Sequence, residues 1–166
     1  MAKQHLRVDG TDDDILISSL ITQAREYCED YQKKKYITQT LELVLDEFPN
    51  IIEFKACSPV QSVTSIKYID ENSVEQTIDP SNYIVDTDSF VARVVPRSSW
   101  PMTNGINSVR VRFVAGYGNE SAVPESVKWA MVLHMRTLYD DLKPEEQTKL
   151  EKARDNLLGM RRVVNI

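Results

Sequence analysis

The 166-residue sequence contains little cysteine or histidine and no long apolar run, and each scarcity excludes a class of protein. The two cysteines, Cys28 and Cys57, have no zinc-ligand spacing, so we expect free buried thiols in a reducing compartment. With two histidines, and no serine or cysteine in a nucleophile context, acyl-transfer chemistry has little support. No apolar run approaches the roughly 18 residues of a membrane span, and the N-terminus lacks the apolar core of a signal peptide. We therefore expect assembly from the cytosol, without a membrane, metal or cofactor.

The overall composition is that of an ordinary soluble globular protein, with 42% apolar and 27% charged residues. A net charge of −5 argues against a surface that grips nucleic acid electrostatically. The charge is uneven, because residues 143–166 carry six bases and four acids, a net +2, which leaves −7 for the rest. The length suits one domain with a single core, so we expect residues 1–166 to form a single domain.

Helical periodicity predicts one helix near the N-terminus and two near the C-terminus. Apolar residues recur every three or four positions, and prolines precede the second and third segments. Acids open the first helix, and Lys33–Lys35 close it as a solvated helix end. The expected bounds are about 12–34, 124–142 and 145–158.

Residues of about 38–115, between these helices, change to the period-two alternation of β-strands. The runs SVTSIKYID and VEQTI are separated by ENS, and VEQTI and NYIVD by DPS, which are short turns typical of antiparallel hairpins. No helix-length segment separates the strands, so parallel crossovers are not expected. The predicted fold class is therefore α+β: a small helical bundle with an inserted antiparallel β-sheet of five to seven strands.

The segment RFVAGYGNESAVPESVKWA, residues 112–130, places two glycines between a strand and a helix, as phosphate-binding loops do. Gly116 and Gly118 lack the third glycine of a dinucleotide fingerprint, and no Lys-Ser/Thr pair follows them. The helix also begins about six residues too late for its N-terminus to reach a phosphate held by the glycines. We interpret the pair as a conformational turn without a ligand, with at least one glycine at positive φ.

Three further candidates have weaker chemical interpretations. His134 could be a general base with Asp140 or Asp141, but its position beside an apolar stripe favours a core or interface histidine. The acids Asp12–Asp14 are explained better by helix-start electrostatics than by metal binding. Trp100, in a long loop, is either half-packed or a subunit-interface anchor. No residue is therefore predicted to be catalytic, cofactor-binding or metal-ligating.

Several segments, taken in order, resemble tailed-phage head–tail connector proteins, also called head-completion or DNA-packaging adaptor proteins. The segments are HLRVDGTDDDILISSLITQAREYCEDY, ITQTLELVLDEFP, SVTSIKYID, TIDPSNYIVD and VRFVAGYG followed by VPESVKWAMVLH, and they cover most of residues 5–139. The resemblance implies a structural protein, not an enzyme, that forms a ring, usually twelvefold, between the capsid portal and the tail. Such a ring extends the DNA channel and completes the head after packaging, and DNA passes without sequence-specific binding. The acidic total fits this role, because negative walls repel phosphates.

The resemblance also implies partners and a location. The partners are the portal protein and a tail-joining or tail-completion protein, and the location is the virion neck, with assembly in the host cytoplasm. Two other functions stay open: a tail-side joining or tail-completion protein with a similar bundle, and a small hydrolase of unfamiliar pattern.

The C-terminal tail, residues 159–166, is implied by the same resemblance to grip the portal. Its valines favour an extended segment, which can add a strand to an exposed sheet edge of the portal. Its arginines can form ion pairs with acidic groups on the portal. The alternative is a frayed terminus. The candidate portal-binding residues are Arg161, Arg162, Val163 and Val164.

Overall fold

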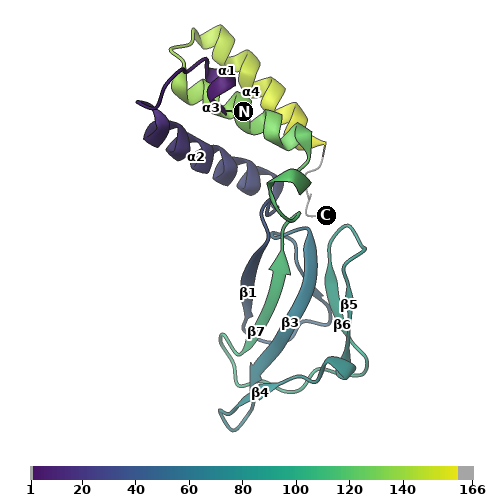
Figure 1. The fold of residues 1–166 in the computed structure, drawn as a ribbon. Coiled ribbons are helices and arrows are strands. Elements are labelled where there is room, and N and C mark those ends of the chain that lie inside the picture. Colours follow the sequence, from purple (N-terminus) through teal and green to yellow (C-terminus); the bar gives the residue numbers. More distant parts are fainter. Residues whose placement is uncertain (1, 161–166) are drawn as a thin grey trace.

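A computed structural model describes residues 2–160 of the chain. These residues form two lobes joined end to end, a helical lobe and a sheet lobe (Figure 1). The helical lobe is built from both ends of the described chain, whereas the sheet lobe is built from the segment between them. The α+β class is confirmed, with an N-terminal helix, antiparallel sheets and two packed C-terminal helices.

The helical lobe contains four helices within residues 2–160: α1 (Ala2–Leu6), α2 (Asp14–Gln32), α3 (Glu125–Tyr139) and α4 (Pro144–Gly159). Helix α2 ends where Lys33 adopts a left-handed conformation, with φ 58°, and donates its N–H to the carbonyl of Glu29. Helix α3 ends at Tyr139, before the expected 142, because Asp140 leaves helical geometry with ψ 141°. The short helix α1 has no counterpart in the prediction, since five residues are too few to display a helical period.

The sheet lobe contains two antiparallel sheets. The larger has the order β1-β7-β3-β4, from β1 (Gln39–Leu45), β7 (Val109–Ala115), β3 (Val60–Ile69) and β4 (Glu75–Thr77). The smaller has the order β2-β6-β5, from β2 (Ile52–Glu53), β6 (Arg93–Pro96) and β5 (Tyr83–Asp86). Apolar side chains of both sheets form one core, which includes Ile52, Ile66, Val94, Val111 and Phe113.

One of the two predicted hairpins is confirmed and the other is wrong. β3 and β4 pair across the ENS turn, with Ile69 opposite Glu75. β4 and β5 lie in different sheets, because the DPS segment forms a 3-10 turn over Pro80–Asn82 that redirects the chain. Asp79 caps this turn by accepting the N–H of Ser81 at 2.8 Å. β5 pairs with β6 instead.

A buried polar network joins the two lobes at the C-terminal end of α2. Gln32 is fully buried; its Nε2 donates to the carbonyl of Leu158 at 2.7 Å, and its Oε1 accepts from the Tyr36 hydroxyl at 2.8 Å. The Tyr36 N–H donates to Glu29 Oε1 at 2.8 Å. Burial raises the pKa of Tyr36, so its hydroxyl remains a hydrogen-bond donor. The network connects α2, α4 and the segment that leads into β1.

Two members of the lysine run lie at this junction, so their interpretation as a solvated helix end is wrong. Lys34 forms a backbone bridge with Ser58, and its Nζ donates to the Tyr117 hydroxyl at 3.2 Å. Lys35 Nζ lies 3.5 Å from the carboxylate of Glu29. The physical reason is that the chain enters the sheet lobe directly after α2, so these residues lie between the lobes.

The two glycines after β7 both have positive φ, a conformation that glycine adopts more freely than other residues. Gly116 and Gly118 have φ of 126° and 133°. A Cβ on Gly116 would also lie 2.6 Å from backbone atoms of Ile37 and Thr38. Gly116 therefore permits the β7 end and the junction segment to touch.

His134 is a core residue of the helical lobe. This agrees with the prediction of a core or interface histidine, which was made from its position beside the apolar stripe. The residue is 7% exposed, and its ring stacks on Tyr27 at a centroid distance of 4.2 Å. Its Nδ1 lies 2.9 Å from Arg154 Nη1, and because a guanidinium only donates, Nδ1 is the acceptor. Burial, followed by the charge of Arg154, lowers the pKa of His134.

Gly116→Ala should destabilise the protein by clearly more than Gly105→Ala. Gly105 has φ 101° and no atom within 4 Å of an added Cβ, so its substitution introduces only backbone strain, roughly 1–2 kcal/mol. Gly116→Ala adds overlap with the backbone of Ile37 and Thr38. Urea unfolding measures both losses, and equal losses would contradict the close approach at Gly116.

The free energy of unfolding should fall as the pH is lowered through about 6.5, the unfolded pKa of histidine. The folded-state pKa of His134 is depressed, so the unfolded chain binds a proton that the folded chain does not. This contribution is fully present above the unfolded pKa and is lost as the pH falls below it. His134→Asn, which keeps an acceptor near Arg154 but does not titrate, should flatten the slope in urea titrations. An unchanged slope would show that other groups cause it.

Candidate functional site

The described residues contain no arrangement suited to catalysis. His134 is buried, and Asp140 pairs with Arg136 at 3.1 Å rather than with His134. Within residues 2–160, no cluster of three or more His, Cys, Asp or Glu side chains could hold a metal ion. Burial raises the pKa of Cys28 to about 12, so its thiol is not a nucleophile at neutral pH.

No described helix is both long enough and apolar enough to cross a bilayer. The candidate portal-binding residues lie outside the described part of the chain, which ends at residue 160. They are Arg161, Arg162, Val163 and Val164.

Exposed apolar side chains, rather than polar groups, mark the candidate functional surfaces, and the most exposed of those before residue 160 lie in three places. We call the first the distal tip (Val74, Met102, Ile106) and the second the β5–β6 loop (residues 87–92, with Phe90). The third is the α2 face, with Ile15 at its centre and Leu16 and Ile21 on its two flanks. Exposed apolar groups of this kind are typical of contact sites with other proteins.

The distal tip is held in shape by hydrogen bonds between segments that are distant in sequence. Asn104 donates to the Ser73 hydroxyl at 2.7 Å, which joins the loop before β7 to the β3–β4 turn. The Asn107 N–H donates to Asp46 Oδ1 at 2.9 Å, which joins the loop to the end of β1. The tip therefore presents its side chains on an ordered loop, with Met102 72% and Ile106 82% exposed.

Trp100, the predicted interface anchor, lies in the same loop but packs against its own lobe. Its ring stacks on Phe48 with a centroid distance of 4.7 Å and an interplanar angle of 9°. The indole N–H is buried without an acceptor among the described residues. An interface role for Trp100 stays a prediction, and the apolar groups that the loop exposes are Met102 and Ile106.

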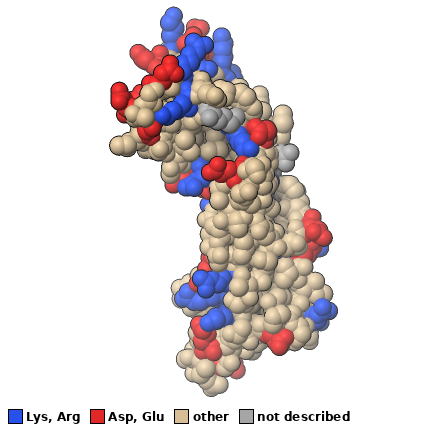
Figure 2. Space-filling model, in the orientation of Figure 1, with Lys and Arg blue, Asp and Glu red and all other residues tan. Residues whose placement is uncertain are grey.

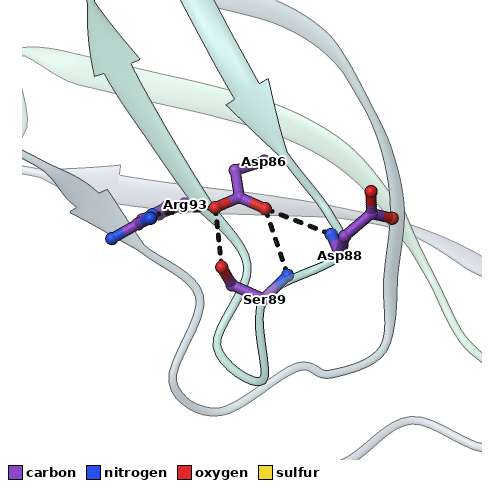
Figure 3. Close-up of polar contacts among 4 residues, drawn as sticks. All are labelled: Asp86, Asp88, Ser89 and Arg93. Carbon is purple, nitrogen blue, oxygen red and sulfur yellow. Dashed lines mark hydrogen bonds and ion pairs between the residues drawn. The ribbon is translucent and has the colours of Figure 1, made fainter.

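Asp86 organises the β5–β6 loop (Figure 3). Its Oδ2 accepts the Ser89 hydroxyl at 2.7 Å and Arg93 Nε at 2.9 Å, and its Oδ1 accepts the N–H groups of Ser89 and Asp88 at 3.1 and 3.2 Å. The bonds from Ser89, and then Arg93, lower the pKa of Asp86 to about 2. The carboxylate therefore stays ionised and holds a loop that leaves Phe90 66% exposed.

A groove of about 610 Å³ lies between α2 and α3. Its walls are mostly apolar, and none of its lining residues comes from α4. Ile21 of the α2 face forms part of one wall, opposite Met131 and Met135 of α3. Three charged residues, Arg25, Lys128 and Glu120, also line it, and Lys128 Nζ pairs with Glu125 at 2.8 Å. Arg25 is therefore the lining cation without an ion pair among residues 2–160, and the groove is suited to an apolar segment that places a carboxylate beside Arg25.

Charged side chains of both signs are mixed on the helical lobe and recur toward the distal end, whereas the middle of the sheet lobe next to the junction is uncharged on the face in Figure 2, with an acidic group at its right-hand edge. This face has no continuous basic patch of the kind that grips nucleic acid.

Three solved structures contain chains with the same fold. The first is from the neck of an empty GTA particle with C6 symmetry: TM-score 0.81, 20% identity, covering 99% of this chain and 88% of that one. The second is from the virion of a native gene transfer agent (GTA) particle: TM-score 0.78, 20% identity, with the same coverage, 99% and 88%. The third is from the neck of a native GTA particle with C12 symmetry: TM-score 0.71, 21% identity, covering 89% and 82%.

No curated protein matches the chain. A family model does match: that of the phage gp6-like head–tail connector proteins aligns with residues 1–87, slightly more than half of the chain. The resemblance seen in the sequence is therefore confirmed, and with it a structural rather than an enzymatic role. The chain belongs to the phage gp6-like head–tail connector family, whose members are structural proteins of the junction between head and tail.

Proposed function

We propose that this chain forms a ring in the virion neck, between the capsid portal and the tail, where it extends the DNA channel and completes the head after packaging. The observation that carries the proposal is the family match, and the fold shared with a GTA neck protein over 99% of the chain supports it. The C6 and C12 symmetry of the two neck structures supports a ring, because closed cyclic symmetry is common among assemblies of identical subunits.

The shape and surfaces of the subunit fit this role. Residues 2–160 form an elongated body (Figure 1). Exposed apolar side chains lie at the distal tip, on the β5–β6 loop and on α2. A subunit with different contact surfaces on different sides makes head-to-tail contacts, which close into a ring when the rotation permits. The net charge of −5 fits a channel that lets DNA pass without binding it.

We propose further that residues 160–166 attach the ring to the portal. Helix α4 ends at Gly159, next to the junction of the lobes (Figure 1). In this proposal the valines extend as a strand along an exposed sheet edge of the portal, and the arginines pair with acidic portal groups. The residues are Arg161, Arg162, Val163 and Val164.

Immobilised portal protein should retain the purified chain, and a reconstruction of the virion should show this fold between portal and tail. Retention by tail proteins but not by the portal would instead support a tail-side joining protein. Density for this chain outside the neck would overturn both assignments.

Deletion of residues 160–166 should abolish portal attachment while leaving the melting temperature nearly unchanged. The reason is that the described core, including Leu158, lies before the deletion. Replacing Arg161 and Arg162 with alanine should weaken attachment and reduce its sensitivity to salt. A truncated chain that binds the portal with full affinity would exclude the tail as the attachment segment.

A further inference from the structure

The solvent-facing surface of α2 carries no charged side chain over residues 15–24, ILISSLITQA. Three apolar members of this stretch are exposed, Ile15 by 88%, Leu16 by 48% and Ile21 by 39%, whereas Ile17, Leu20 and Ala24 face the core. A solvated helix face normally carries charges, as α4 does with exposed Glu145, Glu146, Lys149 and Lys152. Loss of charge on an exposed face is typical of the centre of a protein–protein interface.

One donor in the groove beside this face has no acceptor. Arg25 lines the groove, and its Nε is buried without a hydrogen-bond partner among the described residues. A guanidinium only donates hydrogen bonds, and buried polar groups are nearly always paired. The groove therefore fits a partner that brings a carboxylate together with an apolar side chain.

The N-terminal end of α2 offers that pair of groups. Asp13 accepts from the Tyr139 hydroxyl at 3.0 Å, and Asp14 pairs with Lys3. Asp12, however, is exposed and has no hydrogen bond or ion pair within residues 2–160, and Ile15 follows it by three residues. Asp12 and Arg25 of one chain are 13 positions apart, roughly 20 Å along a helix, so they cannot pair within a single copy.

We propose that the N-terminal end of α2 docks into the α2–α3 groove of a second copy of this chain. Ile15 packs against Ile21 and Met131 of the neighbour, and Asp12 accepts a hydrogen bond from the neighbour's Arg25. The docking end and the groove are different surfaces of one chain, so each copy uses both, and successive contacts run head to tail. The inference rests on the proposed ring and names the surface that closes it.

Self-association can be measured by sedimentation velocity over a range of concentrations, and by counting copies bound per portal ring. Ile15→Asp and Arg25→Glu should each weaken association by about tenfold or more, as expected for an apolar anchor or a charge pair at an interface. The matched controls are Ile84→Asp on β5, where the side chain is 48% exposed, and Lys152→Glu on α4, and both should associate like the wild type. Thermal melts show whether each variant is folded.

A mixture of two variants tests the contact directly. Arg25→Glu and Asp12→Lys should each associate about tenfold or more weakly than the wild type when alone, because each places like charges at every contact. An equal mixture should recover association, because the unchanged Asp12 end of one variant meets the unchanged Arg25 groove of the other. The second contact in the mixture joins the two substituted surfaces, which also carry opposite charges, so assembly can continue beyond a heterodimer.

No recovery in the mixture would overturn the head-to-tail contact, and so would wild-type association of the single variants. If the unmodified chain neither self-associates nor binds portal or tail proteins, the proposed function itself fails, which is a separate result.

Discussion

The placement of the two lobes depends on the buried hydrogen bonds around Tyr36. Its hydroxyl donates to Gln32 and its N–H donates to Glu29, while Gln32 also donates to the Leu158 carbonyl. Burying an amide and a carboxylate costs free energy unless each is paired, so these groups stabilise the fold only when all are present. Tyr36 and Ile37 also line the α2–α3 groove, so the junction and the groove form one continuous structure.

The helices and one hairpin were predictable because their signals are local. The apolar period of α2, α3 and α4 spans several turns, and the ENS turn directly connects two strands that pair. The prediction of the second hairpin was wrong because the chain leaves the larger sheet at the 3-10 turn of Pro80–Asn82 and β5 joins the smaller sheet. The sheet that a strand joins depends on tertiary packing, which the turn sequence does not show. The role of Lys34 was missed for the same kind of reason, since its partners, Ser58 and Tyr117, are distant in sequence.

The candidate surfaces were less predictable than the fold, because exposure depends on tertiary packing. Trp100 was a predicted interface anchor because it is large and aromatic, yet its ring stacks on Phe48 of the same lobe. Met102, in the same loop, is exposed instead. The helical period of the sequence places Ile17, but not Ile15, on the apolar face of α2, and the structure agrees, since Ile17 is 3% and Ile15 88% exposed. The period could not predict that Ile21, which lies on the same apolar face, stays 39% exposed beside the groove.

The helical lobe is assembled from segments at opposite ends of the described chain, so it can close only late in synthesis. Gln32 and Leu158, like Asp13 and Tyr139, are hydrogen-bonded partners 126 residues apart. During translation the strands between residues 39 and 115 can pair before α3 and α4 emerge, whereas α2 must wait for both. A nascent chain therefore has no α2–α3 groove until α3 has emerged, and products that terminate before α3 lack it permanently. Products that terminate between α3 and α4 also lack the Leu158 carbonyl to which Gln32 donates.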